Sequence, residues 1–352
     1  MAIAKLYINN VNALVTGGCG YFGSLLARRL RQEGFVVRVF DINGDLGDSD
    51  GIEMQTGDIR DPLAVARACR QIDVVFHNVA QVPLARESSL FWSVNRDGMR
   101  VLLEAAAGAG VRKIVYTSSS AVFGVPDRNP VTEQTPPKPR EDYGRAKLAG
   151  EDLCRQAAAA GLDVTILRPR TILGHGRLGI FHILFEWVRR GCNIPVLGAG
   201  DNIYQFVHAD DLAQACLLAA RRPGAALYHC GASRFGTMRE TLQALCDHAK
   251  TGSQVRGVPK SPTVALMKLT SALRLSPLAA YHALMYGESL YFDLTKITTE
   301  LGWRAVYSNA EMIIESYEWY LKHRESLADA RGDSAHRSLL SPGILELIGR
   351  WL

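Results

Sequence analysis

The stretch Thr16-Gly17-Gly18-Cys19-Gly20-Tyr21-Phe22-Gly23 separates two segments with different hydrophobic patterns. Residues 11–15 before it form a short apolar run, which is typical of a buried strand. Behind it, Phe22, Leu26 and Leu30 recur at helical spacing, as on one face of an amphipathic helix. The glycines therefore lie at a strand-to-helix turn, the position that a dinucleotide-binding fingerprint requires.

Three glycines of this turn have separate expected roles. Gly17 permits the tight turn, Gly20 lets the backbone approach a pyrophosphate, and Gly23 lets the helix pack on the strand. The helix that begins around Tyr21 and Phe22 presents unpaired N–H groups and a positive dipole end to phosphate. The alternative is a plain glycine-rich turn. The flanking strand and helix favour a bound dinucleotide, so we expect these five residues to contact it.

Size and composition exclude several other classes of protein. A chain of 352 residues fits one large domain or two closely joined ones. Its net charge is +5, and the basic residues are scattered among 35 acidic ones. The sequence has no run of basic residues with aromatic residues between them, so we do not expect nucleic acid as a partner. The seven cysteines form no Cys-x-x-Cys pair, which favours reduced thiols, and we expect no bound metal. Neither a signal segment nor a membrane-spanning apolar run is seen, so we expect a cytoplasmic protein.

The first 170 residues alternate between two patterns. Short β-branched runs cover 12–16, 36–41, 73–77, 112–117 and 163–168. Longer helical patterns cover 21–33, 61–70, 88–109 and 144–160. This alternation predicts βαβ units and a doubly wound α/β fold of the Rossmann type, with a parallel sheet and helices on both faces.

Beyond Pro169 the alternation weakens, and we expect a smaller part of mixed α+β structure that binds the substrate. Residues 204–208 and 226–230 are again strand-like and are expected to return to the parallel sheet. The predicted division is a dinucleotide-binding domain at 1–169 and 203–231, a substrate-binding part at 170–202 and 232–328, and an amphipathic C-terminal tail at 329–352.

The second predicted strand ends in an acidic residue, Asp41. A carboxylate at that distance behind the glycines accepts hydrogen bonds from the adenosine ribose hydroxyls and repels a 2′-phosphate. No arginine or lysine follows before the acidic loop at 45–50, so the sequence favours NAD over NADP. The alternative for Asp41 is a residue that only caps a turn. Asp58, followed by Ile59, is expected to meet the adenine amine.

Tyr143 and Lys147 stand four residues apart in a helical stretch, so both project from one face. A free tyrosine, with a pKa of about 10, is a poor base at neutral pH. A nearby lysine ammonium and a positive nicotinamide ring both favour the phenolate, so we expect this tyrosine to exchange protons near neutral pH. The run 117–120 (Thr-Ser-Ser-Ser) ends a predicted strand and supplies a hydroxyl that polarises a carbonyl. Taken alone, the Tyr-x-x-x-Lys spacing also fits a solvated helix face.

Together these motifs resemble the extended short-chain dehydrogenase/reductases, which include the NAD-dependent epimerases and dehydratases of nucleotide sugars. The resemblance covers about residues 11–325. It extends to Asn95 in the segment 94–98, Leu167-Arg168-Pro169, the segment 206–213 and Leu301-Gly302-Trp303. It implies a Rossmann domain, NAD as the cofactor and hydride chemistry at an alcohol carbon.

The resemblance also implies roles for individual residues. Tyr143 becomes the acid/base, and Lys147 orients the nicotinamide ribose and lowers the tyrosine pKa. Ser119 takes the hydroxyl-donor role because it lies five residues before Gly124 of the Val122-Phe123-Gly124 segment. Ser118 and Ser120 are close rivals for this role. The other residues expected at the cofactor are Asn78, Val79, Ala80, Asn95, Ser118 and Arg168.

Departures from the family pattern bear on the reaction and the substrate. Sugar 4,6-dehydratases have an Asp-Glu pair directly after the catalytic hydroxyl residue, whereas this chain has Ser120-Ala121, so dehydration is not expected. Thr171 stands where nucleotide-sugar epimerases usually have a phosphate-binding asparagine, and Tyr204-Gln205 stand where an arginine reaches the nucleotide. These departures weaken the case for a nucleotide-diphosphate handle. The remaining candidates for anion binding, which also fit exposed cations, are Arg170, Arg177, Arg189 and Arg190.

Two apolar segments near the C-terminus point to lipophilic ligands. Residues 262–286 have a helical and unusually apolar pattern, which resembles the 3β-hydroxysteroid dehydrogenase branch. Residues 339–352 carry an apolar helical stripe, which fits peripheral membrane contact, a partner, or folding back onto the core or onto a dimer mate. A lipid-linked sugar reconciles epimerase chemistry with both segments. We also expect a homodimer.

The sequence thus predicts an enzyme that moves a hydride reversibly between NAD and a secondary alcohol carbon. The favoured substrate is a nucleotide- or lipid-linked sugar, and the product is an epimer if the ketone turns over before the hydride returns. A 3β-hydroxysteroid-type dehydrogenase acting on a lipophilic alcohol is the alternative. A non-catalytic NAD-sensing protein is the third reading, which the Tyr/Lys pair disfavours because such relatives generally lose it.

Overall fold

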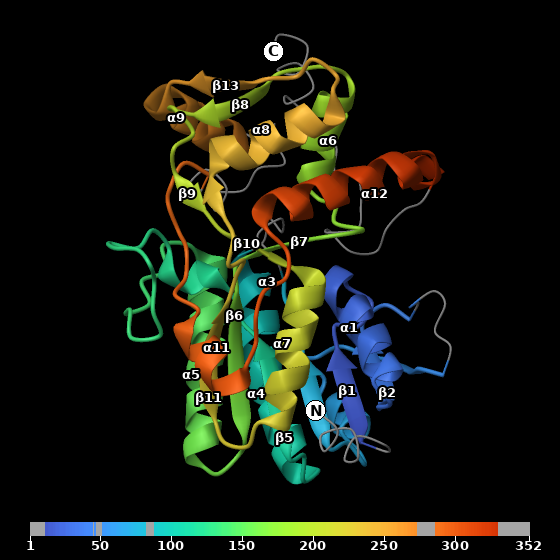
Figure 1. Ribbon diagram of the computed structural model, residues 1–352. Helices are drawn as coiled ribbons and strands as arrows, with labels where there is room; N and C mark the ends of the chain where they lie inside the picture. The colour runs from blue at the N-terminus through green and yellow to red at the C-terminus, as the bar shows by residue number, and fades with distance from the viewer. Residues whose placement is uncertain (1–10, 45, 47–50, 82–87, 273–285, 330–352) are drawn as a thin grey trace.

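The centre of the molecule is a seven-stranded parallel sheet (Figure 1). The computed structural model describes residues 11–44, 46, 51–81, 88–272 and 286–329. The strand order is β11-β6-β5-β4-β1-β2-β3. Their bounds are β1 Asn12–Thr16, β2 Val36–Asp41, β3 Glu53–Thr56, β4 Val74–His77, β5 Lys113–Thr117, β6 Val164–Pro169 and β11 Ala226–Cys230. This order, which reverses beside β1, confirms the predicted doubly wound Rossmann fold.

Helices cover both faces of the sheet because alternate residues of its strands enter two different cores. In β4, Val75 packs with Met99 on one side, whereas Phe76 packs with Leu26 on the other. The helices on the Phe76 side are α1 (Tyr21–Gln32) and α7 (Ala209–Arg221). Those on the Val75 side are α2 (Pro62–Ala68), α4 (Gly98–Gly108) and α5 (Asp142–Ala159). The continuous apolar runs of the sequence are therefore strands that are buried on both faces.

One predicted strand has a different partner from the expected one. The segment 204–208 forms β9 (Ile203–Tyr204) and β10 (Phe206–His208), and β10 pairs with β7 (Thr171–Leu173) in a separate two-stranded sheet. The expectation that this segment returns to the central sheet is therefore wrong, whereas β11 does return and pairs with β6. An apolar strand pattern specifies extended backbone, but it does not specify the neighbouring strand. Here that neighbour is β7, which follows β6 in the chain and lies outside the central sheet.

A second layer of elements stands above the carboxyl edge of the sheet (Figure 1). It contains α6 (Phe181–Arg189), β8 (Ile194–Leu197), β12 (Gly236–Thr237), α8 (Met238–Ala249), β13 (Val255–Val258), α9 (Lys260–Ala272) and α12 (Asn309–Asp329). A third core joins these elements, with Phe185, Leu242 and Ile313 among its members. These elements form the mixed α+β part that the sequence predicts after Pro169.

Segment α11 (Thr295–Leu301) lies away from this upper layer. It packs against β11 and α7, and Trp303 belongs to the core on the α1 side of the sheet. None of the helices in the described ranges is both long and apolar enough to cross a membrane. The predicted tail beyond Asp329 and the apolar segment 273–285 lie outside the described residues.

Candidate active site

The glycine-rich turn between β1 and α1 has the backbone that its sequence predicts. Gly17 has a positive φ of 73°, and a Cβ there would lie 2.8 Å from the backbone nitrogen of Val79. A Cβ on Gly23 would collide with the carbonyl oxygen of Gly17. Gly20, the N-cap of α1, supplies no side-chain hydrogen bond, so the first N–H groups of α1 have no side-chain cap. This turn is built to receive a phosphate group.

Asp41, at the end of β2, holds this turn in place. Its two carboxylate oxygens accept hydrogen bonds from the backbone N–H groups of Cys19 at 3.0 Å and Asn43 at 3.1 Å. Asp41 also lines the cavity that begins at the turn. Asp58 lines the same cavity, but its carboxylate is paired with the Arg60 guanidinium, which lowers the pKa of Asp58.

A cavity of about 890 Å³ rises from the carboxyl edge of the sheet into the upper layer. Most of the residues that the sequence predicts to form the site line this one cavity. They are Gly17, Gly20, Tyr21, Phe22, Gly23, Asp41, Asp58, Ile59, Asn78, Val79, Ala80, Ser118, Ser119, Tyr143 and Lys147. Residues from five strand ends and two helices therefore meet at one edge of the sheet, as the fold requires.

Two predicted cofactor residues, Asn95 and Arg168, lie outside the cavity lining. Asn95 is in a π-helical turn (Ser93–Asp97) within the predicted helix 88–109. Its side-chain amide bonds the backbone N–H and carbonyl of Gln81, at 2.9 and 3.1 Å, and so holds the loop that follows β4. Arg168 forms a buried pair with Glu151.

Tyr143 is positioned by the first turn of α5. The Glu141 side chain caps the helix and accepts hydrogen bonds from the N–H groups of Tyr143 at 2.8 Å and Gly144 at 2.7 Å. A Cβ on Gly144 would lie 2.5 Å from the carbonyl oxygen of Ala121. The absence of a side chain at Gly144 thus lets α5 approach the segment after β5, which carries Ser119.

The three serines after β5 have different partners. Ser118 Oγ donates a hydrogen bond to Glu151 at 2.6 Å, and Ser120 Oγ accepts one from Arg170 at 2.8 Å. Ser119 Oγ accepts a hydrogen bond from the Ala121 N–H at 3.1 Å, and the Ser119 side chain also lowers the pKa of Tyr143 against the effect of burial. Ser119 is therefore the serine of this run whose side chain influences the pKa of Tyr143.

Burial shifts the pKa values of the Tyr/Lys pair in directions that oppose their charged forms. It raises the pKa of Tyr143 to about 12 and lowers that of Lys147 to about 7. The Lys147 ammonium donates to the Thr117 carbonyl oxygen at 2.8 Å and lies 4.4 Å from the ring centroid of Tyr116. Burial is the largest influence on the pKa of Tyr143, and the expectation that Lys147 lowers this pKa stays a prediction.

Glu151 is a residue of this region that the sequence analysis did not identify. It is fully buried on α5, and its carboxylate accepts two hydrogen bonds from Arg168, at 2.8 and 2.5 Å, besides the one from Ser118. Its negative charge also raises the pKa of Lys147, against the effect of burial. The available signal was its spacing, since Tyr143, Lys147 and Glu151 recur every four residues on one face of α5.

Comparison with known proteins places this site in a family. A model of the NAD dependent epimerase/dehydratase family matches residues 13–231. The chain belongs to this family. The match confirms the resemblance to extended short-chain dehydrogenase/reductases, and the enzyme's cofactor is NAD.

Relatives of this epimerase/dehydratase family member span nearly its whole length. The uncharacterized protein y4nG of Sinorhizobium fredii is 54% identical over 96% of this chain and 85% of that protein. A UDP-glucose 4-epimerase of Mycolicibacterium smegmatis is 30% identical over 88% of this chain and 98% of that protein. Among solved structures, MoeE5 in complex with UDP-glucuronic acid and NAD is 26% identical, with a TM-score of 0.71, over 88% of this chain and 99% of that one.

The residues of this family member fit NAD. The uncapped start of α1 suits the pyrophosphate, and the Asp41 carboxylate at the end of β2 suits the ribose hydroxyls of the adenosine. Arg60 pairs with Asp58 at the adenosine end, whereas Asp41 is held by backbone N–H groups. The acidic residues 45, 48 and 50 lie outside the described residues.

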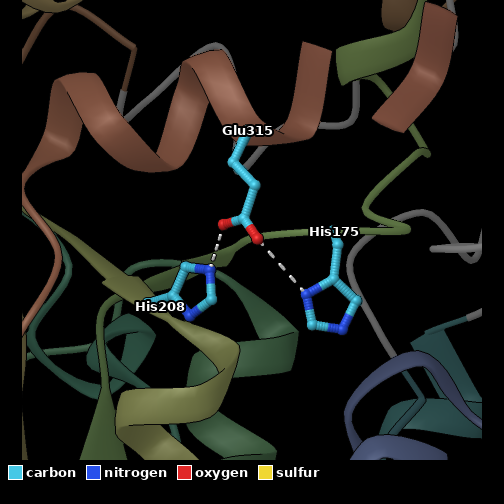
Figure 2. A group of neighbouring side chains, drawn as sticks. All are labelled: His175, His208 and Glu315. Carbon is cyan, nitrogen blue, oxygen red and sulfur yellow. Dashed lines mark hydrogen bonds and ion pairs between the residues drawn. The ribbon is translucent and has the colours of Figure 1, made fainter. Parts of the chain in front are cut away.

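A second polar cluster ties α12 of the upper layer to β10 and to the loop that follows β7 (Figure 2). Glu315 on α12 hydrogen-bonds His208 Nε2 at 2.6 Å and lies 3.6 Å from His175 Nδ1. The three side chains have potential metal-ligating atoms within 4.8 Å of one another. The N–H of Asp210 donates to His208 Nδ1, so His208 carries its proton on Nε2. This Nε2–H donates a hydrogen bond to the Glu315 carboxylate. We call Glu315, His175 and His208 the clamp, because together they hold the loop between β7 and α6, which carries His175.

Proposed function

We propose that this enzyme is a sugar epimerase that oxidises and re-reduces a secondary alcohol carbon. The observation that carries the proposal is that Tyr143, Lys147 and Ser119 line the same cavity as the glycine-rich turn. Relatives of similar length are named UDP-glucose 4-epimerases, which supports a sugar as the substrate. The proposed substrate is a nucleotide- or lipid-linked sugar with one hydroxyl between the tyrosine and serine side chains.

Each residue of the proposed trio has one task. Tyr143 Oη takes the proton from the substrate hydroxyl during oxidation and returns it during reduction. Ser119 Oγ donates a hydrogen bond to the same oxygen and stabilises the charge that develops there. Lys147, in its protonated form, favours the phenolate by its charge and binds the nicotinamide ribose. NAD, when bound, supplies the acceptor and donor of the hydride.

Dehydration does not form part of the proposal. Loss of water from a sugar needs a further acid/base, and Ser120-Ala121 occupy the positions where dehydratases carry it. The Ser120 hydroxyl is already hydrogen-bonded to Arg170. The proposed reaction therefore stays at the level of the ketone and returns either epimer.

The proposal is tested by replacing Tyr143 with phenylalanine. Tyr143→Phe removes the acid/base oxygen but keeps the ring that packs edge-on against Phe91, so we expect turnover to fall by at least about 100-fold with NAD affinity unchanged. The matched control is Tyr291→Phe, because Tyr291 lies outside the cavity lining. An active Tyr143→Phe enzyme would refute the mechanism. Tight NAD binding without turnover of any alcohol would favour the NAD-sensing protein instead.

A 3β-hydroxysteroid-type dehydrogenase is the second candidate. The observation that favours it is the apolar lining of the cavity far from the glycine-rich turn, which includes Phe181, Leu184 and Trp187. A dehydrogenase releases NADH in each cycle, whereas an epimerase returns the hydride. Accumulation of NADH absorbance with pregnenolone, and none with a sugar substrate, would favour the dehydrogenase.

A cytoplasmic homodimer with peripheral membrane contact through 339–352 is the proposed state of the protein in the cell. The apolar stripe of that segment in the sequence supports the membrane contact. Light scattering measures the mass of the assembly, and flotation with anionic vesicles measures the membrane contact. Equal vesicle recovery of the full chain and of a chain ending at residue 338 would contradict the role of the tail.

A further inference from the structure

The cavity has two ends of opposite character. Its charged lining residues are Asp41, Asp58, Arg60, Lys147, Arg170 and Arg177, all at the glycine-rich turn or around the catalytic residues. The far end is lined by side chains of α6, β8, α8 and α9, and Arg177 marks its boundary with the charged end, since its guanidinium lies 5.6 Å from the Phe181 ring centroid. These four elements belong to the upper layer (Figure 1).

The walls of the far end are large apolar side chains. Phe181, Leu184 and Trp187 come from α6, Leu197 from β8, Leu242 from α8 and Leu266 from α9. A wall of this composition gains free energy by removing apolar ligand surface from water, and it offers nothing to a charged group.

Two polar side chains of the far end, Tyr286 and Thr270, are engaged within the protein. Tyr286 donates its hydroxyl to the Pro195 carbonyl oxygen at 2.9 Å. Thr270 Oγ1 donates to the Leu266 carbonyl oxygen, also at 2.9 Å, and the Tyr204 hydroxyl pairs with Thr171 Oγ1 at the same distance. A nucleotide base placed among α6, β8 and α9 would lose hydrogen bonds to water, which is unfavourable, and the arginines that could meet a diphosphate, Arg170 and Arg177, lie at the boundary with the charged end.

The wall that α9 contributes to the far end is partly accessible to solvent. Leu266 lines the cavity and is nevertheless 49% exposed, so its side chain lies at the boundary between cavity and solvent. Leu269, three residues further along α9, is 56% exposed and is not part of the lining. A long ligand can therefore extend from the proposed catalytic residues along the far end to the accessible side chain of Leu266.

From these observations we infer that the far end holds an extended apolar chain, which serves as the handle of the substrate in place of a nucleotide. The inference rests on the proposed function, since it concerns the group attached to the sugar that reacts at Tyr143. Specificity then comes from apolar surface that the chain buries along α6, α8 and α9, and not from hydrogen bonds to a base.

The test compares three glucosides that differ only in their handle. Binding of methyl β-D-glucoside, n-octyl β-D-glucoside below its micelle concentration, and UDP-glucose is measured by calorimetry on the full-length protein saturated with NAD. We expect the octyl compound to bind at least about 100-fold more tightly than the methyl compound, with a more negative heat-capacity change, because seven further methylene groups are buried. UDP-glucose is expected to bind no more tightly than the methyl compound.

Two substitutions on α9 locate the binding. Leu266→Glu places a charge at the wall and is expected to remove most of the octyl advantage, whereas Leu269→Glu, on the same helix but outside the lining, is expected to retain it. Both side chains are about half exposed, so both variants should fold, which their NAD affinity and thermal melts verify. Equal effects of the two variants, or UDP-glucose binding as tight as that of the octyl compound, would overturn the inference.

The inference and the proposed function fail in different ways. A protein that binds NAD and epimerises UDP-glucose, but gains nothing from the octyl chain, keeps the function and loses the inference. A protein that binds octyl glucoside through α9, but shows no turnover with any sugar, keeps the apolar site and loses the function.

Discussion

At the residue scale, three adjacent hydroxyls are distinguished entirely by what surrounds them. Ser118 is hydrogen-bonded to Glu151 and Ser120 to Arg170, whereas Ser119 accepts a hydrogen bond from the Ala121 N–H and lowers the pKa of Tyr143. Strand β5 has just ended at this point, so side chains no longer alternate strictly between two faces. Each serine consequently points toward a different neighbour.

Replacing Ser119 with alanine should therefore affect chemistry more than binding. We expect Ser119→Ala to lower kcat by about 100-fold, the usual loss for one donor to a developing oxyanion, with little change in NAD affinity. Ser120→Ala is the matched control, since Ser120 serves Arg170. Steady-state turnover of the two variants measures the difference, and a larger loss for Ser120→Ala would contradict the assignment.

Lys147 provides a prediction about stability and pH. Its folded pKa of about 7 lies below the unfolded value of about 10.5, so the folded chain disfavours the charged form. The loss of stability caused by burying the charged ammonium is complete below about pH 7 and decreases as the pH rises toward about 10.5. Lys147→Met, although inactive, should therefore raise the free energy of unfolding by about 1–4 kcal/mol at mildly acid pH, and less at alkaline pH.

Chemical denaturation of the NAD-free protein across this pH range measures that difference. A parent enzyme that is more stable than Lys147→Met at mildly acid pH would show that the hydrogen bond to the Thr117 carbonyl and the contact with the Tyr116 ring outweigh the burial of the ammonium.

At the scale of elements, helix α5 carries most of the site on one face. Its cap is Glu141, and Tyr143, Lys147 and Glu151 follow at intervals of one turn. The buried pair of Glu151 with Arg168 joins α5 to β6, and the Ser118 hydroxyl joins it to the end of β5. The helix thereby aligns the catalytic side chains with the sheet edge that binds the cofactor.

The contact that brings α5 close to Ser119 depends on Gly144. Gly144→Ala would place a Cβ 2.5 Å from the Ala121 carbonyl oxygen, and both partners are backbone, so the helix must shift. We expect a loss of turnover of at least about tenfold and a destabilisation of about 1–3 kcal/mol, as for overpacked sites. Gly108→Ala is the control, because a Cβ there meets nothing within 4 Å, and it should be neutral or slightly stabilising. Equal turnover in the two variants would contradict the requirement for close approach.

At the scale of the whole molecule, the site exists only where the sheet and the upper layer meet. The sheet edge supplies the glycine-rich turn, Asp41 and Ser119, whereas α6, α8 and α9 supply the apolar far end. The clamp of Glu315 with His175 and His208 fixes the loop between these two halves (Figure 2).

Loss of the clamp should show a defined pH dependence. Hydrogen bonds from the two histidines lower the pKa of Glu315 to about 2, so its contribution is present above the unfolded value of about 4.3 and is lost as the pH falls toward 2. Glu315 raises the pKa of His175, so that contribution is present below about 6.5 and is lost as the pH rises through the folded pKa.

Glu315→Gln should therefore destabilise the protein most between about pH 4.3 and about pH 6.5, the unfolded pKa values of the glutamate and the histidine. After allowance for solvent screening of the partly exposed carboxylate, we expect about 1 kcal/mol, measured by thermal melts over the pH series. The control is Glu318→Gln, because Glu318 lies on the same helix as Glu315 and forms an exposed pair with His248 of α8. This substitution should destabilise the protein less. A constant difference at every pH would contradict the role of the charges.

The sequence by itself determined the features that depend on neighbouring residues. The turn at 16–23, the acidic end of β2 and the one-turn spacing of Tyr143 and Lys147 could be predicted because backbone strain, strand periodicity and helix periodicity are local. These features were sufficient for the Rossmann fold, NAD and the family. They were insufficient for the position of Asn95, since its partner Gln81 lies across a loop.

Tertiary structure decided everything that depends on distant segments. It selected β7 as the partner of β10, brought Ser119 and Tyr143 into one cavity, and buried Glu151 against Arg168. It also raised the pKa of Tyr143, because the desolvation of a phenol depends on the whole fold around it. The apolar end of the cavity is the largest such feature. Its walls come from helices and strands that are separated in sequence, and only their packing creates an apolar chamber beside the catalytic residues.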